Sequence, residues 1–400
     1  MHSKALQDVK VLDFTHYVSG PYCTKLLGDY GADIVKIERP SEGDPCRKLP
    51  PFEETSRAPE ESLLFKYLNT NKKSIELDLK SDFGRNAIEQ LAMDTDILVE
   101  NFRPGVLSSF GLTKEKLRRT NPKLVIVSIS NFGQTGPYSH FKANDLILYA
   151  LGGLMYIFGS TDKAPIKHAF RQAQFKAGTN AASAALMAYY NSLTSGVGDE
   201  IDISIQESIS ASVRDATTSY ATSGVVRTRQ SPMKGEIPRT PIEVKDGHVV
   251  PITFGSSDWN KTAELLDDEK LYNPKFKTPE GRRENAQEFE QLVRAAFASK
   301  GKHELFYGAH SHRELVYGLV QDAADLLENP QYQHDAYFYK PEENTGSGTQ
   351  FPGRPFLLSK TPWTIHSQAP ELGQHNDEIL IKKLNLHKIY PIDEGCSDGK

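Results

Sequence analysis

The sequence predicts an α/β fold whose core is a parallel sheet covered by helices on both faces. Apolar strands and helical segments alternate over the first 130 residues, and one strand–helix–strand unit fits within about 30 residues. The chain of 400 residues also exceeds the size of one ordinary core, about 100–200 residues. We therefore expect two domains, or one large domain that carries a smaller inserted one.

The first strand–helix–strand unit covers residues 9–38. Residues 9–14 predict a short apolar strand, and residues 20–32 predict a helix whose apolar side chains share one face. Residues 33–38 predict the next strand. Because a right-handed crossover joins two such strands, we expect them to run parallel.

The alternation continues beyond this unit. Ser81 is a typical N-cap and begins a helix over 81–95, which leads to a strand at 96–100. A short helix at 112–123 precedes a strand at 124–130 that is rich in β-branched side chains. This repetition predicts a doubly wound sheet.

Residues 131–145 predict a loop because turn-forming residues crowd there. Helices follow at about 146–156 and 177–194, and the alternation at 201–208 predicts one more strand that leads into a helix. From residue 226 the sequence becomes more charged and contains proline, which indicates that a second domain begins.

The second domain starts with a predicted hairpin that turns at 246–247, an Asp-Gly pair. Helices are expected near 258–267, 284–299 and 312–327. The glycine- and proline-rich stretch at 343–356 predicts a connector.

The charge balance excludes some classes of partner. With 47 Lys and Arg against 52 Asp and Glu, the chain offers no basic field for nucleic acid or for an anionic membrane surface, so we expect a small-molecule partner. The N-terminus lacks the apolar run of a secretory signal, and the longest apolar run, 146–159, is shorter than the roughly 18 residues of a membrane span. Cys23, Cys46 and Cys396 have neither the number nor the spacing of a disulfide framework or a zinc site. We expect a cytoplasmic protein without a metal site.

The generic motifs of phosphate binding, dinucleotide binding, ester hydrolysis and zinc binding do not stand out. Five blocks nevertheless occur in a characteristic order: "VLDFTHYVSGPYCTKLLGDYGADIVKIERPSEGDPCR", "NKKSIELDLKSDFGR", "ILVENFRPGVLSSFGL", "ISNFGQTGPY" and "GVGDEIDISIQES". They resemble the family III CoA-transferases, the group of formyl-CoA and carnitine CoA-transferases. The resemblance covers most of residues 9–210 and resumes near the end in "FPGRPFLLSKTP" and "ELGQHNDEIL".

This resemblance implies an architecture. Members have a Rossmann-like large domain built from both chain ends, a small α+β domain inserted between them, and two chains interlocked like linked rings. Carried onto this sequence, residues 1–210 begin the large domain, 211–225 form a linker helix, 226–330 form the small domain, and 331–400 return to the large domain. An interlocked dimer is therefore implied.

The resemblance also implies a site for coenzyme A on the large domain. The matching positions are Arg39, Leu77, Lys80, Asn101, Phe102 and Lys142. Arg39 and Lys80 can form charge-assisted hydrogen bonds with phosphates, and Phe102 follows a strand at the edge where open α/β sheets bind ligands. The plainer alternative is that the cations are solvated and that Asn101 and Phe102 only shape a turn.

The family's catalytic position differs in this chain. In members, an aspartate attacks the acyl-CoA thioester to form a mixed anhydride, and the CoA thiolate then returns to form an aspartyl-CoA thioester. The matching residue here is Gln174, whose amide has no anionic oxygen for the attack. Related acyl-CoA racemases add a histidine at the position of Asn144, which does not titrate near neutrality. Asp145 matches an acidic residue of active members and is interpreted as structural. No catalytic residue is therefore assigned, because both positions are degenerate.

Further departures point the same way. Val18 stands where formyl-CoA transferases have glutamine, and Asn144 stands where they have tyrosine. The segment 229–239, which matches their glycine-rich flap, contains the single glycine Gly235. Losses at several active-site positions beside a retained scaffold are typical of a non-catalytic subunit.

We therefore expect the aspartate-less subunit of a heteromeric CoA-transferase, with a paralogous subunit that supplies the aspartate. Such an enzyme exchanges CoA between an acyl-CoA and a carboxylic acid, as in the succinyl-CoA:benzylsuccinate CoA-transferases. Coenzyme A is then a substrate and not a covalently bound cofactor. Two alternatives remain open: a homodimeric CoA-transferase that uses another residue, and a regulatory protein that binds acyl-CoA without chemistry.

Overall fold

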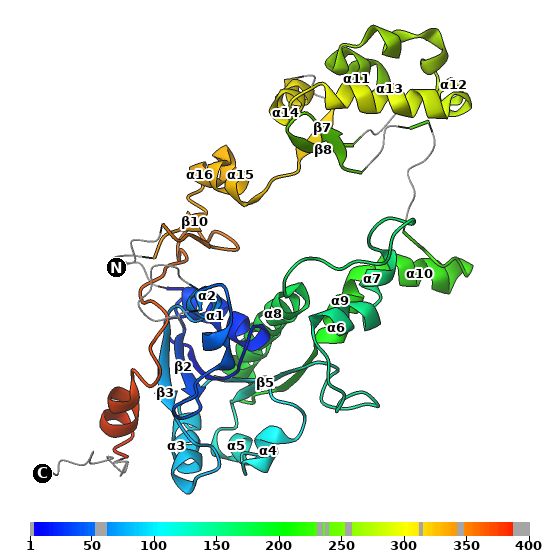
Figure 1. Ribbon diagram of the computed structural model, residues 1–400. Helices are drawn as coiled ribbons and strands as arrows, with labels where there is room; N and C mark the ends of the chain where they lie inside the picture. The colour runs from blue at the N-terminus through cyan, green and yellow to red at the C-terminus, as the bar shows by residue number, and fades with distance from the viewer. Residues whose placement is uncertain are drawn as a thin grey trace, which may run out of the picture. The chain divides into compact units, whose positions relative to one another are not determined.

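The computed structural model describes residues 4–52, 62–229, 235–236, 240–252, 258–311, 315–341 and 348–386. The chain divides into two compact units (Figure 1). The large unit comprises 1–159, 163–228 and the residues from 339 on, and the small unit comprises 160–162 and 229–338. Each unit has its own hydrophobic core.

A six-stranded parallel sheet forms the centre of the large unit. Its strands are β1 (Lys10–Phe14), β2 (Asp33–Glu38), β3 (Lys72–Glu76), β4 (Ile97–Glu100), β5 (Val125–Ser130) and β6 (Glu200–Ser204), and they lie in the order β3-β2-β1-β4-β5-β6. The strand order reverses at the pair β1–β4, so the loops that follow these two strands diverge and leave a crevice at the carboxyl edge of the sheet. The predicted α/β class with a doubly wound sheet is confirmed.

Helices cover both faces of this sheet. The helices of the large unit are α1 (Ser19–Asp29), η1 (Pro45–Lys48), α2 (Leu63–Leu68), α3 (Asp82–Ala92), α4 (Val106–Ser109), α5 (Lys114–Thr120), α6 (Asp145–Leu151), α7 (Leu154–Ile157), α8 (Gln172–Ser195), α9 (Ile205–Ser210), η2 (Ala211–Val213) and α10 (Arg214–Ser223). Val11 of β1 packs into the core that contains α1 and α8, and the next residue, Leu12, packs into the core that contains α3 and α5. The two faces alternate along the strand as the pleat requires. Ser81 caps α3 as predicted, because its Oγ accepts the backbone N–H of Gly84 at 3.0 Å.

The sequence analysis missed strand β3 because polar residues occupy its buried positions. Lys72, at its start, is only 2% exposed. Its ammonium group pairs with the Asp13 carboxylate at 3.0 Å. A lysine in an isolated sequence indicates a surface position, since buried lysines are rare unless they are paired. The short helix α2 was also not predicted.

The C-terminal part of the described chain covers the edge of the sheet at β3. The backbone N–H of Ser74 donates to Nδ1 of His375 at 3.2 Å, and that of Glu76 donates to Oδ1 of Asn376 at 2.8 Å. The π-helical turn Asp377–Lys383 then packs into the adjacent core. These contacts protect an edge strand that would otherwise expose unpaired backbone groups. The large domain is therefore built from both parts of the chain, as the resemblance implied.

The small unit contains the predicted hairpin. Its strands β7 (Ile242–Val244) and β8 (Gly247–Ile252) pair antiparallel, and the chain turns between Val244 and Gly247. The remaining elements are α11 (Asp258–Leu266), η3 (Glu269–Tyr272), η4 (Pro274–Phe276), α12 (Pro279–Glu284), α13 (Ala286–Ala298), α14 (Lys302–Ser311), β9 (Val316–Leu319), α15 (Ala323–Glu328) and α16 (Pro330–His334). The short strands β10 (Phe338–Tyr339) and β11 (Phe351–Pro352) follow. Part of the connector predicted at 343–356 lies outside the described residues.

The predicted helix over 312–327 is wrong. Residues 312–314 lie outside the described residues, Val316–Leu319 form β9, and a helix begins only at Ala323. Strand β9 pairs antiparallel with β8, where its backbone groups satisfy the otherwise open edge of the hairpin. Long-range pairing has overridden local helical spacing.

Among the helices in the described part of the chain, none combines the length and apolar character needed to cross a membrane.

Candidate functional site

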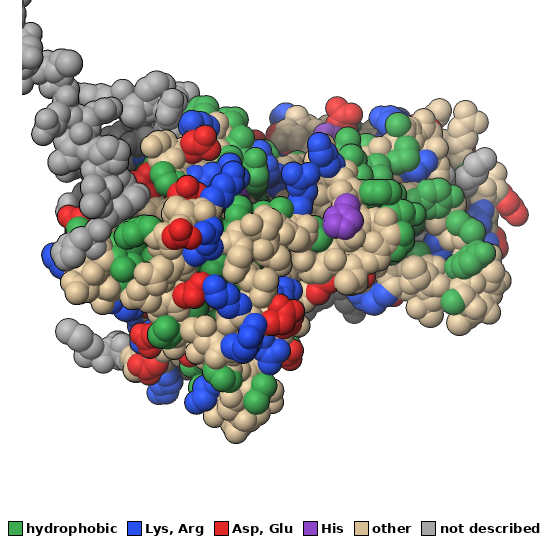
Figure 2. Space-filling model, turned by 90° about the horizontal axis from the view of Figure 1, so that it is seen from below, with side chains coloured by type: hydrophobic (Ala, Val, Ile, Leu, Met, Phe, Trp, Pro, Cys, Tyr) green, Lys and Arg blue, Asp and Glu red, His purple; other side chains and the backbone are tan. Residues whose placement is uncertain are grey.

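Two pockets at the carboxyl edge of the sheet share Phe102 as a wall. The α8 pocket, about 650 Å³, is lined by residues that follow β1, β4 and β5 and by the first turn of α8. The Arg39 pocket, about 500 Å³, is lined by residues that follow β2 and β3, together with Phe102, Val106 and Phe110. Figure 2 shows Lys and Arg side chains gathered beside hydrophobic ones on the face seen from below.

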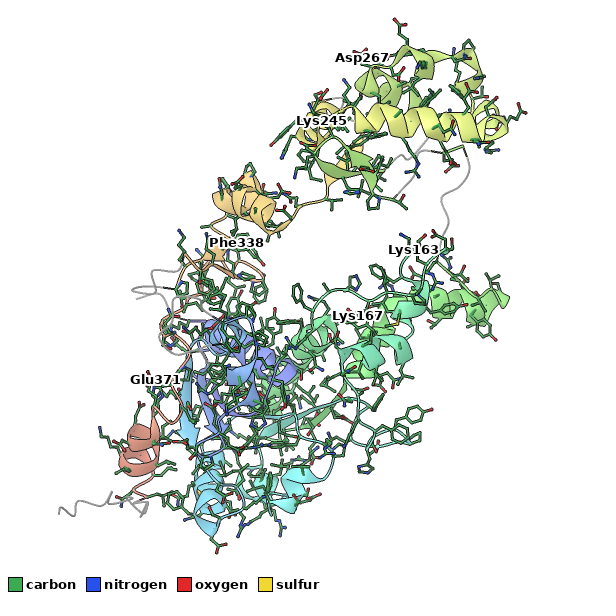
Figure 3. The ribbon with its side chains drawn as sticks, in the orientation of Figure 1. Lys163, Lys167, Lys245, Asp267, Phe338 and Glu371 are labelled. Carbon is green, nitrogen blue, oxygen red and sulfur yellow. The ribbon has the colours of Figure 1, made fainter. Side chains whose placement is uncertain are left out.

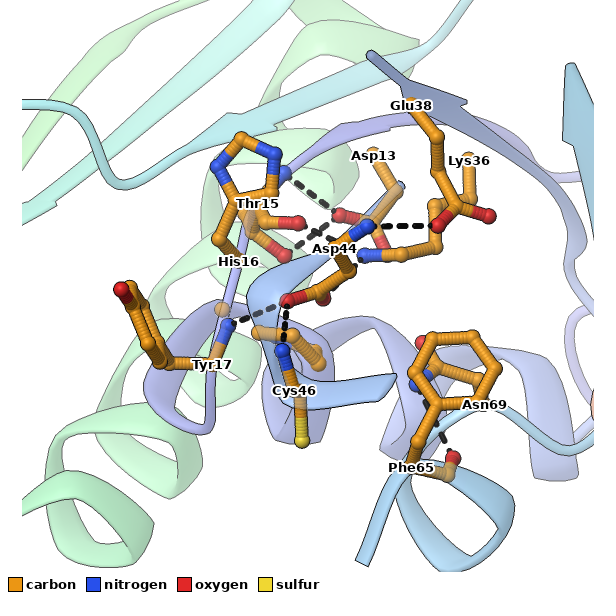
Figure 4. Close-up of polar contacts among 12 residues, drawn as sticks. Asp13, Thr15, His16, Tyr17, Lys36, Glu38, Asp44, Cys46, Phe65 and Asn69 are labelled. Atoms are coloured by element: carbon orange, nitrogen blue, oxygen red, sulfur yellow. Dashed lines mark hydrogen bonds and ion pairs between the residues drawn. The ribbon is translucent and has the colours of Figure 1, made fainter. Parts of the chain in front are cut away.

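Buried charges hold the loop that follows β1 (Figure 4). The Asp13 carboxylate pairs with Lys72 at 3.0 Å. Lys36 pairs with Asp44 at 3.0 Å and donates to the backbone carbonyl of Thr15 at 2.6 Å. Burial raises the pKa of Asp13, but the charges of Lys36 and Lys72 outweigh burial and hold that pKa well below its usual range. Asp13 is therefore ionised and lies within a buried network of charges.

The same loop turns sharply at Tyr17 and so divides its side chains between the two pockets. Tyr17 has a φ of 66°, in the left-handed region, and its backbone N–H donates to Asp44 Oδ1 at 3.0 Å. This conformation is costly for a residue with a Cβ, and the bond to Asp44 helps to hold it. His16 lines the Arg39 pocket, whereas Tyr17 and the two residues after it line the α8 pocket.

Asn101 clamps this loop to the end of β4. Its Oδ1 accepts the backbone N–H of His16 at 2.8 Å, and its Nδ2 donates to the carbonyl of His16 at 2.7 Å. The next residue, Phe102, donates its backbone N–H to the Glu100 carboxylate at 2.8 Å. Asn101 thus joins the two loops at the point where the strand order reverses, and it orients Phe102 between the pockets.

His16 is a site residue that the sequence analysis missed. It is 8% exposed, and no hydrogen-bond partner for its buried Nε2 exists among the described residues. Burial, reinforced by the charge of Lys36, lowers the pKa of His16 to about 4, so the imidazole is neutral at pH 7. Its ring meets that of Phe102 edge to face, with centroids 5.8 Å apart. Its position just after β1, at the edge where ligands bind, was the available signal.

The Arg39 pocket brings together four of the six positions that the resemblance assigned to coenzyme A. Arg39, Leu77, Lys80 and Phe102 all line it. The one ion pair that Arg39 forms in the described structure, with Glu42, is long at 3.7 Å and solvent-exposed, so it competes weakly with a ligand. Glu38, Glu42 and Asp78 also line the pocket, but Glu38 pairs with Arg47 at 2.7 Å and Asp78 accepts the backbone N–H of Lys80 at 2.9 Å. The two cations beside apolar side chains suit a phosphorylated ligand with an apolar body. Asn101 lines the α8 pocket instead, and Lys142 is exposed and lines neither pocket.

The α8 pocket brings together Gln174 and Asn144, the two positions that the resemblance matched to catalytic residues. Gln174 lies in the first turn of α8 and is partly exposed, and within the described structure its side-chain amide has no hydrogen-bond partner. Asn144 is the N-cap of α6, because its Oδ1 accepts the backbone N–H of Ile147 at 3.1 Å. An asparagine is well suited to this N-cap position.

Asp145 connects α6 to α8. Its Oδ1 accepts the backbone N–H of Ala173 at 3.0 Å, and its Oδ2 pairs with Lys167 Nζ at 3.1 Å. Lys167, labelled in Figure 3, comes from the segment between α7 and α8. Both oxygens of Asp145 therefore have partners in the wall of the α8 pocket.

The comparisons with known proteins identify the scaffold. The model of the family described as "CoA-transferase family III" matches residues 6–376. The chain belongs to CoA-transferase family III. It is 30% identical over 389 residues to the succinyl-CoA–D-citramalate CoA-transferase of Chloroflexus aurantiacus, with 96% of this chain and 95% of that protein covered.

A second relative is the succinyl-CoA:(R)-benzylsuccinate CoA-transferase subunit BbsE of Thauera aromatica, 28% identical over 393 residues, with 93% of each protein covered. Among solved structures, a CAIB/BAIF family protein from Brucella suis has a TM-score of 0.85 and 26% identity, covering 95% of this chain and 99% of that one. The resemblance that the sequence blocks carried is confirmed.

In this family III chain, small residues fix the position of Gln174. Ala173, Ala177 and Gly178 are buried on the face of α8 that meets α1. A Cβ at Gly178 would lie 2.5 Å from the backbone oxygen of Ser19, so the backbones of α8 and α1 approach each other closely at this point. This close approach sets where the first turn of α8, and with it Gln174, meets the loop after β1.

Two further positions complete the comparison with the sequence. Val18 is 1% exposed and packs with Tyr22 and Phe175 while lining the α8 pocket, so it supplies an apolar surface there. Residues 230–234 and 237–239 of the expected flap lie outside the described residues, so the expectation about that flap stays a prediction. Sequence reasoning also missed Arg171, which lines the α8 pocket.

Proposed function

We propose that this chain is the subunit of a heteromeric family III CoA-transferase that lacks the nucleophile, and that a paralogous subunit provides the catalytic aspartate. One observation carries the proposal. Gln174, in the first turn of α8, lines the pocket where the resemblance expects the aspartate, and it presents an amide with no partner among the described residues. Asp145, the one acidic side chain among the described residues of that pocket, is held by Ala173 and Lys167.

The proposed reaction moves CoA from an acyl-CoA to a carboxylic acid. The aspartate of the paralogous subunit attacks the thioester carbonyl, the C–S bond breaks, and CoA leaves as a thiolate. The thiolate attacks the aspartyl carbonyl of the resulting anhydride and releases the donor acid. The acceptor carboxylate then attacks the aspartyl thioester carbonyl, the C–S bond breaks, and a second anhydride forms with release of the thiolate. The thiolate attacks the acceptor's acyl carbon in this anhydride, which gives the acceptor's CoA thioester and releases the aspartate. The amide of Gln174 is neutral and takes no part as a nucleophile.

The relatives support the choice of donor and the heteromeric assembly. Succinyl-CoA appears in the names of both relatives described above, and BbsE is described as a subunit. We propose succinyl-CoA as the donor and a carboxylic acid, with an aromatic succinate such as benzylsuccinate tested first, as the acceptor. The proposal includes an interlocked, dimer-like assembly in the cytoplasm.

Transferase activity tests the proposal directly. Wild-type protein, Gln174→Asp and the matched control Gln174→Asn are each assayed with succinyl-CoA and the acid, with and without the paralogue encoded nearest to the gene. We expect activity only with the paralogue, and equal activity for all three forms of this chain. Activity of the wild-type chain alone would overturn the proposal.

Two other outcomes identify the alternatives. Hydroxylamine or borohydride trapping in the presence of acyl-CoA would label this chain if it is a homodimeric enzyme that uses another residue. CoA binding without transferase activity in any combination would favour a regulatory protein.

We also propose that the Arg39 pocket, including Leu77 and Phe102, binds coenzyme A through the two cations Arg39 and Lys80. Loss of a hydrogen bond to a charged group corresponds to an affinity loss of about ten- to a hundredfold. Arg39→Gln and Lys80→Gln should weaken CoA binding in calorimetry by this factor. Arg119→Gln, a change of an exposed arginine on α5, is the matched control. Unchanged affinity in the two pocket variants would refute this site.

A further inference from the structure

The α8 pocket carries an excess of positive charge. Arg103, Lys167 and Arg171 line it, and Asp145 is its one acidic side chain among the described residues. Asp145 already pairs with Lys167 at 3.1 Å. Two guanidinium groups therefore remain without an internal counter-charge, in a pocket where the related enzymes would place an additional carboxylate.

Arg171 is held at the pocket by its backbone. Its carbonyl accepts the N–H groups of Gln174 at 3.1 Å and Phe175 at 3.2 Å as α8 begins. The guanidinium is partly buried, and among the described residues no carboxylate lies within ion-pair distance of it. Arg103, which follows Phe102 on the loop after β4, is exposed at the rim of the pocket and has no ion-pair partner within the described structure. A guanidinium has five donors in a planar fork that matches a carboxylate.

A buried hydroxyl in the same pocket also lacks a partner. Ser130, at the end of β5, is 6% exposed, and its Oγ forms no hydrogen bond within the described structure. A buried hydroxyl without a partner costs free energy, and a bound acceptor relieves that cost. This observation is independent of the charges, and it also indicates a ligand with hydrogen-bonding oxygens.

The rest of the lining is apolar. Val18, Phe102, Ile129, Phe141 and Ile205 contribute hydrocarbon surface. A small inorganic anion would leave this surface unused, whereas an organic acid would cover it. Two unpaired guanidinium groups balance two carboxylates, so the pocket suits a dicarboxylate with an apolar body.

We propose that the α8 pocket of this chain binds a free dicarboxylate without chemistry, with Arg171 as its principal ligand. The replacement of the nucleophile by Gln174 leaves a neutral amide in the pocket that Arg171 lines, where an aspartate would add a negative charge. The inference rests on the proposed function, because it takes Gln174 to occupy the nucleophile position. Under this proposal, the subunit binds the acid while the acid is not joined to CoA.

Calorimetry with the full-length chain, in the assembly in which it purifies, tests the inference. Phenylsuccinate is the dicarboxylate probe, 3-phenylpropionate is its monocarboxylate counterpart, and sulfate is the inorganic dianion. Arg171→Gln should weaken phenylsuccinate binding about ten- to a hundredfold, the range of a lost hydrogen bond to a charged group. Arg171→Lys keeps the positive charge but loses the planar set of donors. Its affinity for phenylsuccinate should therefore lie between those of the wild type and Arg171→Gln. Arg119→Gln is the control and should bind as the wild type does.

Each outcome of these binding measurements either supports or overturns the proposed dicarboxylate site. Tight binding of phenylsuccinate that depends on Arg171, with weaker binding of the monocarboxylate and of sulfate, supports it. No phenylsuccinate binding at millimolar concentration, or equal binding by wild-type and folded Arg171→Lys and Arg171→Gln proteins, overturns it. Equal binding of the monocarboxylate overturns the dicarboxylate class, and equal binding of sulfate overturns the organic acid. The measurement uses no transferase activity, so its failure is distinct from failure of the proposed function.

Discussion

Removal of the Asp13 charge should destabilise the large unit severely. Asp13 and Lys72 are both fully buried, their ion pair is 3.0 Å long, and Thr24 donates to the same carboxylate at 2.7 Å. In Asp13→Asn the amide would point donors at groups that are already donors, and Lys72 would remain as a buried cation without an anion. Breaking one side of a buried pair costs about 3–5 kcal/mol of unfolding free energy.

The chain offers a matched control for this change. Lys10 and Asp94 form an ion pair of 2.6 Å whose side chains are 42% and 59% exposed. Asp94→Asn should therefore cost no more than about 1 kcal/mol. The double variant Asp13→Asn/Lys72→Met should recover part of the loss, because it removes the orphaned cation.

Urea unfolding followed by tryptophan fluorescence measures these differences. Trp363 reports on the large unit, because its Nε1 donates to Asp29 at 3.0 Å. A Trp259→Phe background removes the other tryptophan of the chain, which lies in the core of the small unit. If Asp13→Asn costs no more unfolding free energy than Asp94→Asn, the buried network does not stabilise the large unit.

Three further predictions use the same unfolding measurement. Gly178→Ala should cost about 1–3 kcal/mol, because the new Cβ would lie 2.5 Å from the Ser19 oxygen; a loss equal to that of the exposed Ser183→Ala would contradict the close helix contact. Asn144→Ala should cost about 1 kcal/mol through loss of the α6 cap, whereas Asn144→Asp should retain it; equal losses would argue against the cap. His16 has a folded pKa of about 4, below its unfolded value of about 6.5, so the folded state binds fewer protons and its stability falls as the pH drops through this window. This loss of unfolding free energy amounts to about 3 kcal/mol, and His16→Asn should abolish it. The same pH dependence in both proteins would refute a buried neutral imidazole.

The regular parts of the large unit were predictable from local patterns. Apolar β1, β2, β4 and β5 and the Ser81 cap follow rules that act over a few residues. Strand β3 was not predictable in this way, because Lys72 becomes a core residue only through Asp13, 59 positions away in the sequence. Strand β9 depends similarly on its partner β8.

Some residues of the candidate site could likewise be identified from the sequence, and others could not. Gln174 and Asn144 were identified because the resemblance supplied positions for them, and the structure brings both into one pocket. The clamp between Asn101 and His16 joins residues 85 positions apart, and no local pattern indicates it. The unpaired state of Arg171 is also a long-range property, since it depends on which carboxylates the fold brings near.

Phe102 lines both pockets, so a ligand that moves its side chain in one pocket would alter the other. If CoA displaces Phe102 or the loop that Asn101 clamps, the affinity of the neighbouring pocket for an acid changes by some factor. The acid must then change the affinity for CoA by the same factor, because the coupling free energy belongs to the pair of ligands. Equal factors measured in both directions would show that the two pockets communicate.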